Sequence, residues 1–538
     1  MNKMILEKKI EELKKYLQEK NYEKVILESK IVAKKFPDNL VILNFLGVAQ
    51  NLNNQIEVSI STFKKILAID NSQIQVQINL ASAFKKNNQF REAIKLYLNL
   101  FTGEKNSIKY GIDLMNCYFS SKNFDRCTET CKKILSIDKN NFDALMKISE
   151  TFYVKREYQK AINYLNLAKN IDEKNINVLT LLAVVYFDIS EYKKSENLYK
   201  LILSLSNKSS DYYYIYNNLG LLYEEQGNIK EAENNFIIGL DMRPDDEILN
   251  RSFALLLIKN NKIKESIQYL KKGGDRCKSH LLKAYYELDL RKEYNNLLDS
   301  IIIDNPFSMR IASITEFASE QNNMINKYPL CPNNISLLRH LNIDKELNIE
   351  NFSYEKLLIE CQTKELIWEP KESNTVGGYQ TFGDIFSMNL PNINILKANI
   401  ERAIKKYKSE ISLKNKTLFT EHWPKEMYFK SWLVDLQDGG WQASHIHSTG
   451  WLSGVFYIDI PLDITLDEGF IEFTKYGETS KPKKISEKKI INPKQGDLVL
   501  FPASLFHRTH PFKSKKNRIC IGFDLMPEEE IIFKNKMI

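Results

Sequence analysis

The feature that most limits how this chain can fold is a 34-residue repeat in its N-terminal half. The repeat is marked by a large aliphatic residue and its neighbour: Leu46-Gly47, Leu80-Ala81, Leu114-Met115, Ile148-Ser149 and Leu182-Ala183. Thirteen residues after each Leu or Ile comes a small residue, and four further on comes a second core position: Ser59 and Phe63, Ala93 and Tyr97, Cys127 and Cys131, Ala161 and Leu165, Ser195 and Tyr199. A fixed period of this length indicates stacked units that bury their apolar faces on their neighbours.

Each unit is predicted to be a pair of helices joined by a short turn. The small residue lets the second helix approach the first, and the larger residue fills the space beneath. An insertion near residues 208–210 shifts the frame, and the pattern resumes at Leu219-Gly220 and again at Phe253-Ala254. Because Cys127 and Cys131 stand at the two core positions, we expect buried thiols there and not a metal or redox pair.

This pattern resembles the tetratricopeptide repeat, with matching positions over roughly residues 10–275. The resemblance implies an all-α solenoid over residues 1–275 whose groove binds a protein or peptide partner, itself a candidate substrate. Residues 276–330 are predicted to be degenerate capping helices and a connector to the next domain.

Composition narrows the class of protein. With 538 residues the chain is too long for one hydrophobic core, so two or more domains are expected. It has no run of about 18 apolar residues and no apolar leader, which disfavours a membrane partner. Seven scattered Cys residues predict free thiols in a reducing, cytoplasmic setting. The net charge of +8 comes from 76 basic and 68 acidic residues without a dense basic patch, which disfavours nucleic-acid binding.

From about residue 328 the repeat is gone and the chain changes character. One helix is expected at 393–407. Most of the short β-rich segments follow it, and turn residues separate these segments from one another. These predicted strands are 427–434, 452–460, 470–474, 498–501 and 518–525. Several short strands of this kind favour a jelly roll, or double-stranded β-helix, with flanking helices over residues 331–538.

Histidines concentrate in this last domain. His445 and His447 are two apart, so on an extended segment both point to one face. His507 follows the strand 498–501, and Arg518 opens the final strand. A jelly roll brings the first pair beside the distant His, so three imidazoles can converge on one metal ion. The alternative is that they are surface or packing residues, which the combined motifs disfavour.

The motifs resemble those of the iron(II)- and 2-oxoglutarate-dependent oxygenases, and more closely those of oxygenases that follow tetratricopeptide repeats. Residues 444–448, Ser-His-Ile-His-Ser, are similar to an Asn-His-Val-His-Pro element. Residues 507–512, His-Arg-Thr-His-Pro-Phe, are similar to a His-Gly-Thr-Val-Pro-Phe element, and 376–381 resemble the family's Gly-Gly-Thr-Gln-Thr stretch. The resemblance covers nearly the whole chain.

The resemblance implies Fe(II) as cofactor and 2-oxoglutarate as cosubstrate, with His445 and His507 as metal ligands. In most such enzymes the residue two after the first His is Asp or Glu, whereas here it is His447. Either the iron has three His ligands, which we favour, or His447 supports the site from outside it. In the second case a carboxylate such as Asp435 or Glu472 completes the site.

The same resemblance implies a site for the distal carboxylate of 2-oxoglutarate. Arg518 would bind it with its planar guanidinium, and Tyr457 is a second candidate contact. The family usually has Ser or Thr two residues after this Arg; Cys520 is a weaker donor. His422 and His510 have no assigned role.

The implied function is a dioxygenase, an oxidoreductase that hydroxylates a C–H bond while O₂ converts 2-oxoglutarate to succinate and CO₂. Its repeats would recruit or present a protein or peptide. One alternative is a repeat-based interaction scaffold with a catalytically inactive jelly roll. Another is an oxygenase of sugars or nucleotides, because family membership does not define the substrate. The joint presence of His445, His447, His507 and Arg518 favours the enzyme.

Overall fold

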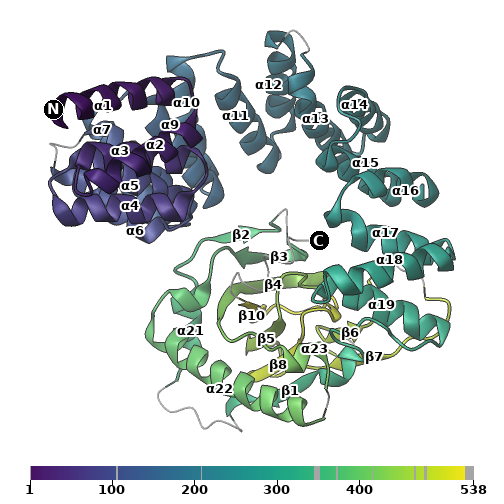
Figure 1. Ribbon diagram of the computed structural model, residues 1–538. Coiled ribbons are helices and arrows are strands. Elements are labelled where there is room, and N and C mark those ends of the chain that lie inside the picture. The colour runs from purple at the N-terminus through teal and green to yellow at the C-terminus, as the bar shows by residue number, and fades with distance from the viewer. Residues whose placement is uncertain are drawn as a thin grey trace. The chain divides into compact units, whose positions relative to one another are not determined.

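The computed structural model describes residues 2–103, 107–206, 209–344, 352–370, 373–414, 416–465, 468–477 and 482–527. The chain divides into two compact units, Met1–Ile215 and Tyr216–Ile538. The first unit is helical, and the second contains further helices and then a sheet (Figure 1).

Antiparallel helix pairs build the N-terminal array. Its helices are α1 (Asn2–Gln18), α2 (Tyr22–Lys35), α3 (Leu40–Leu52), α4 (Ile56–Ile69), α5 (Ile74–Lys86), α6 (Phe90–Gly103), α7 (Ile108–Ser120), α8 (Phe124–Ile137), α9 (Phe142–Val154), α10 (Tyr158–Ile171), α11 (Ile176–Asp188), α12 (Tyr192–Leu205), α13 (Tyr213–Glu225), α14 (Ile229–Met242), α15 (Glu247–Lys259) and α16 (Ile263–Lys272). The predicted insertion near residues 208–210 lies partly outside the described residues; Ser209 caps a short 3-10 helix, Ser210–Tyr212.

The turn inside each repeat has its own 34-residue signature. One residue of the turn lies in the left-handed region, with φ between 56° and 62° at Asn54, Asn88, Lys122, Arg156 and Ser190. A left-handed residue directly after a helix ends it, because the chain can no longer continue the helical hydrogen bonds. The 34-residue period is therefore present in the backbone conformation as well as in the sizes of the core side chains.

The predicted core positions pack as a matched pair within each repeat. Gly47 leaves room for Phe63, since a Cβ at Gly47 would lie 2.5 Å from that ring. The small polar residue of the second helix donates to a carbonyl of the first, twelve residues earlier. These bonds are Ser59 to Gly47 (2.8 Å), Cys127 to Met115 (3.4 Å) and Ser195 to Ala183 (2.7 Å).

Cys131, the exception to the size pattern, is explained by its partner. Where other repeats have Gly, Ala or Ser, this repeat has the larger Met115, whose sulfur lies 3.5 Å from the Cys131 thiol. A large residue opposite a small one conserves the packed volume. Cys127 and Cys131 are fully buried, which confirms the prediction of buried thiols.

Three helices lead from the repeats to the sheet: α17 (Lys278–Glu287), α18 (Arg291–Asp304) and α19 (Met309–Asn322). Leu298, Met309 and Ile311 share one apolar core with sheet residues such as Leu498 and Ile521. A buried ion pair, Lys475 to Glu316 at 3.1 Å, also joins α19 to the strand region. These helices therefore belong structurally to the sheet-containing unit.

The described strands form one curled antiparallel sheet. They are β1 (Arg339–Asn342), β2 (Leu366–Trp368), β3 (Thr375–Thr381), β4 (Met427–His445), β5 (Leu452–Asp459), β6 (Ile471–Thr474), β7 (Lys488–Ile491), β8 (Asp497–Pro502), β9 (Phe506–Thr509) and β10 (Arg518–Pro527). Their order is β1-β8-β5-β10-β4-β9-β6-β7, with β3 also on β4 and β2 on β3. The long strand β4 pairs with β10 through residues 427–436 and with β9 near its end.

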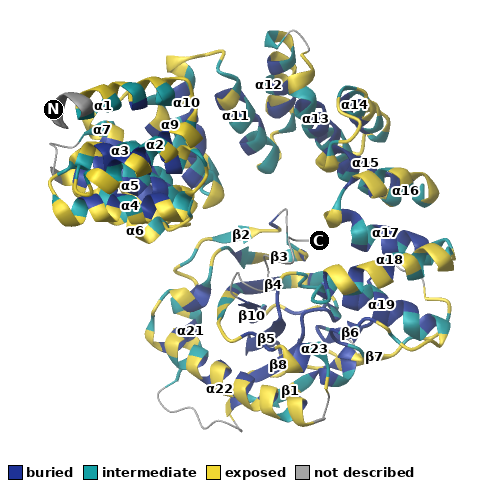
Figure 2. Ribbon diagram, viewed as in Figure 1, coloured by how far each residue is buried: buried dark blue, intermediate teal, exposed yellow. Residues whose placement is uncertain are grey.

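The two faces of the sheet have different partners. On β10, Ile519, Ile521 and Phe523 pack in the core shared with α21 (Tyr354–Cys361) and α22 (Pro391–Lys414). Alternate side chains of a strand point to opposite faces, so Cys520 faces the inner cluster with Tyr457 and Phe501. Figure 2 shows the buried sheet and the more exposed outer surfaces of the covering helices.

The predicted fold class is confirmed: a helical repeat array precedes a curled antiparallel half-barrel of the double-stranded β-helix type. The predicted helix 393–407 lies within α22. Three predicted strands lie within β4, β8 and β10, and the predicted strands 452–460 and 470–474 each exceed β5 and β6 by one residue. The boundaries proposed at residues 275 and 330 remain a proposal. Among the described residues, no helix is both long and apolar enough to cross a membrane.

Candidate metal centre

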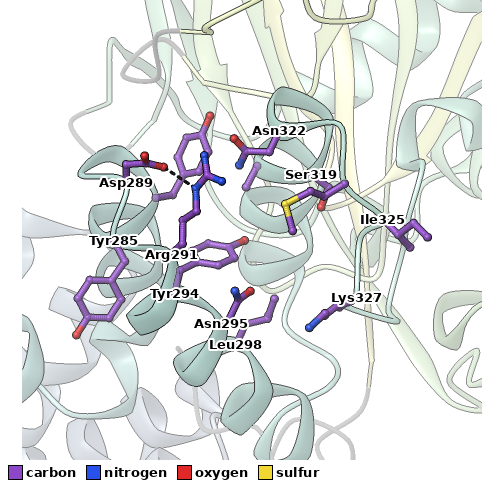
Figure 3. Close-up of a pocket in the computed structure, with 13 residues that line it drawn as sticks. Tyr285, Asp289, Arg291, Tyr294, Asn295, Leu298, Ser319, Asn322, Ile325 and Lys327 are labelled. Atoms are coloured by element: carbon purple, nitrogen blue, oxygen red, sulfur yellow. Dashed lines mark hydrogen bonds and ion pairs between the residues drawn. The ribbon is translucent and has the colours of Figure 1, made fainter.

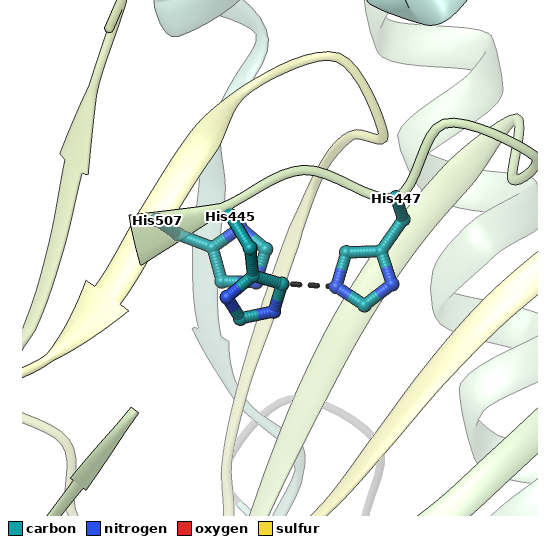
Figure 4. A group of neighbouring side chains, drawn as sticks. All are labelled: His445, His447 and His507. Atoms are coloured by element: carbon teal, nitrogen blue, oxygen red, sulfur yellow. Dashed lines mark hydrogen bonds between the residues drawn. The ribbon is translucent and has the colours of Figure 1, made fainter. Parts of the chain in front are cut away.

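Three imidazoles meet at one end of the half-barrel (Figure 4). His445 ends β4 and stands directly opposite His507 of β9 in the antiparallel register. His447 follows two residues after His445, on the turn that leads to β5. The ring centroids are 4.2 Å apart for His445 and His507, and 5.0 and 5.1 Å from His447 to these two. The predicted convergence of the three side chains is therefore present.

The outer nitrogen of each ring has a hydrogen-bond acceptor. Nδ1 of His445 lies 2.7 Å from the Ala443 carbonyl, and Nδ1 of His507 lies 3.2 Å from the Leu505 carbonyl. Nδ1 of His447 lies 2.9 Å from the Asp524 carboxylate. A proton on Nδ1 satisfies each acceptor, and it leaves the Nε2 lone pair of each ring available for a metal.

The spacing of the inner nitrogens fits one metal ion. Nε2 of His447 and Nε2 of His507 are 3.3 Å apart. A metal–nitrogen bond of about 2.1 Å places two ligands roughly 3.0 Å apart at a right angle and 3.4 Å at the tetrahedral angle. One ligand atom from each of the three His residues lies within 4.8 Å of the others, so the group can hold an ion.

Burial keeps the His445 and His507 rings neutral. The pKa of His445 is lowered to about 3, first by burial and then by neighbouring His447. The pKa of His507 is well below its ordinary value, first because of burial and then because of the two adjacent histidines. A neutral imidazole is the form that binds metal ions.

The two carboxylates considered as alternative ligands do not join this group. Glu472 accepts from Arg508 at 2.7 Å across the β6–β9 ladder, and it lies on the face opposite to that of Phe473 and His507. Asp435 alternates with Val434, which lines the histidine pocket, so its side chain faces away. Glu472 pairs with Arg508, and Asp435 accepts a hydrogen bond from the side chain of Gln437.

The same pocket continues to Arg518 and Tyr457. It holds about 410 Å³ of space, open solvent included. Arg518 and Tyr457 are 1% and 0% exposed, yet Nη2 of Arg518 and the phenol oxygen of Tyr457 make no well-formed hydrogen bond. Nε of Arg518 donates to the Gly469 carbonyl at 2.8 Å, which orients the guanidinium. Burial raises the pKa of Tyr457, so it is a neutral donor.

These unpaired groups test whether 2-oxoglutarate fits. A buried polar atom without a partner is costly, and such atoms are rare unless a ligand satisfies them. An unpaired Nη2 on a buried guanidinium and an unpaired phenol hydroxyl suit a carboxylate. Cys520 lies close to Arg518, with Sγ 4.0 Å from Nη1, and its thiol is too weak a donor to replace a hydroxyl.

The two histidines without an assigned role lie elsewhere. His510 stacks on Phe470 at 3.9 Å and lies 3.6 Å from Glu472. His422 is exposed and has its ring 5.5 Å from that of Phe307. Neither belongs to the metal-ligating group in the described part of the chain.

Sequence reasoning missed Asp524 and Trp432, which both contact His447. The Trp432 ring stacks on His447 with centroids 5.5 Å apart and an angle of 17°. The signal for Asp524 was strand alternation: Arg518, Cys520, Gly522 and Asp524 are two apart along β10, so they share its inner face. Recognising it required knowing that the strand passes both ends of the pocket.

A second hollow, of about 590 Å³ with open solvent included, lies among α17, α18 and α19 (Figure 3). Tyr286, Arg291 and Tyr294 line it, and the exposed side chains of Met324 and Ile325 stand at its rim. It shares no lining residue with the histidine pocket.

The half-barrel that holds the histidine group matches a known family in sequence. The profile of the family described as "Putative 2OG-Fe(II) oxygenase" matches residues 430–524, and a tetratricopeptide-repeat profile matches 213–246. The chain is a tetratricopeptide-repeat protein with a C-terminal domain of that 2OG-Fe(II) oxygenase family. The resemblance inferred from its motifs is thereby confirmed. No curated protein matches the chain.

Solved structures of repeat proteins resemble parts of the chain. A tetratricopeptide repeat protein from Parabacteroides merdae is 15% identical, with 47% of this chain and 98% of that one covered and a TM-score of 0.39. PilF of Pseudomonas aeruginosa is 18% identical, with 38% and 94% covered and a TM-score of 0.32. The C-terminal part of a repeat-containing protein from Cytophaga hutchinsonii is 11% identical, with 45% and 98% covered and a TM-score of 0.39.

Proposed function

We propose that the protein is an Fe(II)- and 2-oxoglutarate-dependent hydroxylase whose repeats bind a protein or peptide partner. The observation that carries the proposal is one pocket with two complementary ends. At one end three imidazoles converge, and at the other Nη2 of a buried guanidinium and a buried phenol oxygen make no well-formed hydrogen bond. A pocket with only one of these ends would suit many ligands, whereas both together suit a metal and a dicarboxylate.

Each end has a distinct task. His445, His447 and His507 would hold Fe(II), with coordination positions left open for the cosubstrate and O₂. Arg518 and Tyr457 would bind the distal carboxylate of 2-oxoglutarate and so orient its keto-acid end toward the metal. Bound together, Fe(II) and 2-oxoglutarate supply the oxidation of a C–H bond by O₂, with succinate and CO₂ as the other products.

The walls between the two ends are suited to exclude water. Val434, Val455 and Phe501 line the pocket and are 1%, 9% and 2% exposed. Cys520 and Gly522 are the small inner-face residues between Arg518 and Asp524 on β10, and they leave room for a bound molecule. An apolar wall strengthens the pairing of Arg518 with a carboxylate, because the local dielectric is low.

The repeats support the second half of the proposal. Arrays of this kind present extended surfaces that bind proteins and peptides. The partner is then either the molecule that is hydroxylated or a protein that delivers it. The competing function is an interaction scaffold with an inactive half-barrel, which predicts neither metal binding nor turnover.

The test compares purified wild-type protein with His507→Ala and with His422→Ala as the matched control. We expect about one equivalent of Fe(II) per wild-type chain and slow conversion of 2-oxoglutarate to succinate without added substrate. His507→Ala should lose both, because two protein donors remain, whereas His422→Ala should keep both. Iron content in His507→Ala equal to that of the wild type would contradict the site, and a wild-type chain without iron would favour the scaffold.

A further inference from the structure

We propose that Asp524 is a positioning residue that supplies, through His447, the negative charge that a metal site of three imidazoles lacks; this inference rests on the proposed function of the pocket. The common iron site of such oxygenases has two His ligands and one carboxylate. Here the third position holds His447, and a carboxylate stands directly behind it. The charge is retained, one residue further from the metal.

The carboxylate of Asp524 is held at both oxygens. One oxygen accepts from Nδ1 of His447 at 2.9 Å, and the other accepts from the Ser453 hydroxyl at 2.7 Å. Asp524 is only 4% exposed, so water screens its charge weakly. The pair is therefore a fixed carboxylate–imidazole couple.

The other two histidines provide an internal comparison. Nδ1 of His445 and Nδ1 of His507 both point to backbone carbonyls, of Ala443 and Leu505. A carbonyl orients the ring without contributing a formal charge. Only His447, the residue at the position usually held by a carboxylate ligand, is backed by a carboxylate in this group.

The surrounding sequence fits this arrangement. A Cβ at Gly450 would lie 3.3 Å from the side chain of Asp524, so a glycine there leaves the carboxylate its space. A Cβ at Gly522 would lie 2.9 Å from the Trp432 ring, which stacks on the face of His447. With Trp432 on its face and Asp524 at its Nδ1, the His447 ring has one orientation toward the pocket.

The expected consequence is electronic as well as geometric. A carboxylate bound to Nδ1–H makes Nε2 a more basic donor, and loss of such a partner typically weakens metal binding about 10–100-fold. The carboxylate of Asp524 also favours the more highly charged ferric state, because a fixed negative charge stabilises Fe(III) more than Fe(II). Asp524 should therefore lower the Fe(III)/Fe(II) potential of the loaded protein.

The experiment compares Asp524→Asn with Ser453→Ala, by anaerobic Fe(II) titration and by the potential of the iron-loaded full chain. Asp524→Asn keeps the shape and removes the charge, so we expect about 10–100-fold weaker Fe(II) binding and a raised potential. Ser453→Ala removes a hydrogen bond to the same carboxylate but keeps the charge, so its potential should stay at the wild-type value. Wild-type affinity and potential in Asp524→Asn would overturn this inference alone, whereas a wild-type chain that binds no Fe(II) would overturn the proposed function.

A second arm places the carboxylate at the metal itself. His447→Asp recreates the two-His, one-carboxylate set and should retain Fe(II). In that background Asp524→Asn should no longer weaken binding, because the imidazole that transmits its charge is gone. An equal loss in both backgrounds would show that Asp524 acts on the fold and would overturn the inference. If Asp524→Asn does not fold, Asp524→Glu and Asp524→Gln provide a pair of equal length that differs only in charge, with the same expected shift in potential between them.

Discussion

The repeat array and the half-barrel pocket both bury polar groups, and the surroundings of particular groups differ between them. In the array, Ser59 and Ser195 sit in the core, and each donates to a carbonyl within its own repeat. In the pocket, Nη2 of Arg518 and the hydroxyl of Tyr457 are equally buried and make no well-formed hydrogen bond. A buried polar group with a partner inside the protein contributes to the stability of the fold. A buried polar group without a partner lowers stability, so its presence favours a role in ligand binding.

Buried polar atoms without partners also occur in the repeat array. These include the hydroxyls of Ser29 and Thr180 and the amide oxygens of Asn51, Asn217 and Asn250. These neutral atoms are weak indicators of a ligand, since burying them costs far less than burying a charge. The pocket differs because Nη2 of a charged group and a phenol hydroxyl are unpaired together, next to three imidazoles that could hold a metal ion.

The largest expected effect is at Arg518. In the metal-loaded protein without O₂, 2-oxoglutarate at a hundred times its Kd should raise the free energy of unfolding of the wild type by about 2.7 kcal/mol. In Arg518→Met this increase should vanish, because the carboxylate loses its bidentate donor. Without ligand, Arg518→Met should be about as stable as the wild type or more so, since it removes a cation that lacks a full set of partners.

Arg508→Met is the matched control, because Arg508 lies on β9 of the same sheet and pairs with Glu472. It should keep the stabilisation by 2-oxoglutarate. A large loss of stability in unliganded Arg518→Met, measured by chemical unfolding, would show that Arg518 is a structural residue. The difference between the buried polar groups of the array and those of the pocket would then not hold.

Sequence reasoning succeeded where short-range patterns carry the information. The 34-residue step located the paired core positions, and the His-x-His spacing placed His445 and His447 on one face of the chain. The proximity of His507 followed from the expected sheet topology. Asp524 could not be found in this way, because its contact with His447 depends on the register of β10 against β4 and on the course of the turn after His445. An acidic residue in a buried strand is otherwise unremarkable by itself.

Met115 and Cys131 test the packing side of the comparison. Cys131→Leu alone should lower the free energy of unfolding by about 1–3 kcal/mol through overpacking, and Met115→Ala alone should lower it by roughly 2–5 kcal/mol through a cavity. Combined, they recreate the Ala254 and Leu270 pair of another repeat, so most of the loss should be recovered.

The urea midpoints of the wild type, both single variants and the double variant give the coupling between the two positions. A strong positive coupling is expected, because the Cys131 thiol lies 3.5 Å from the Met115 sulfur. Simple additivity of the two losses would mean that the array does not match sizes within a repeat, and the explanation of Cys131 would be wrong.

The smallest expected effect is at the small polar position itself. Ser59→Ala removes the bond to the Gly47 carbonyl, so the free energy of unfolding should fall by about 0.5–1.5 kcal/mol. The loss stays small because alanine fits this position, as Ala93 and Ala161 show in other repeats.

The reverse change, Ala93→Ser, should then cost little, since the carbonyl of Ala81 stands twelve residues earlier, as that of Gly47 does for Ser59, and can accept from the new hydroxyl. Both are measured as shifts of the urea midpoint at constant slope. A loss at Ala93→Ser of several kcal/mol would mean that the carbonyl cannot accept the bond, and that pairing within the repeat is particular to Ser59 and Ser195 and not a property of the array.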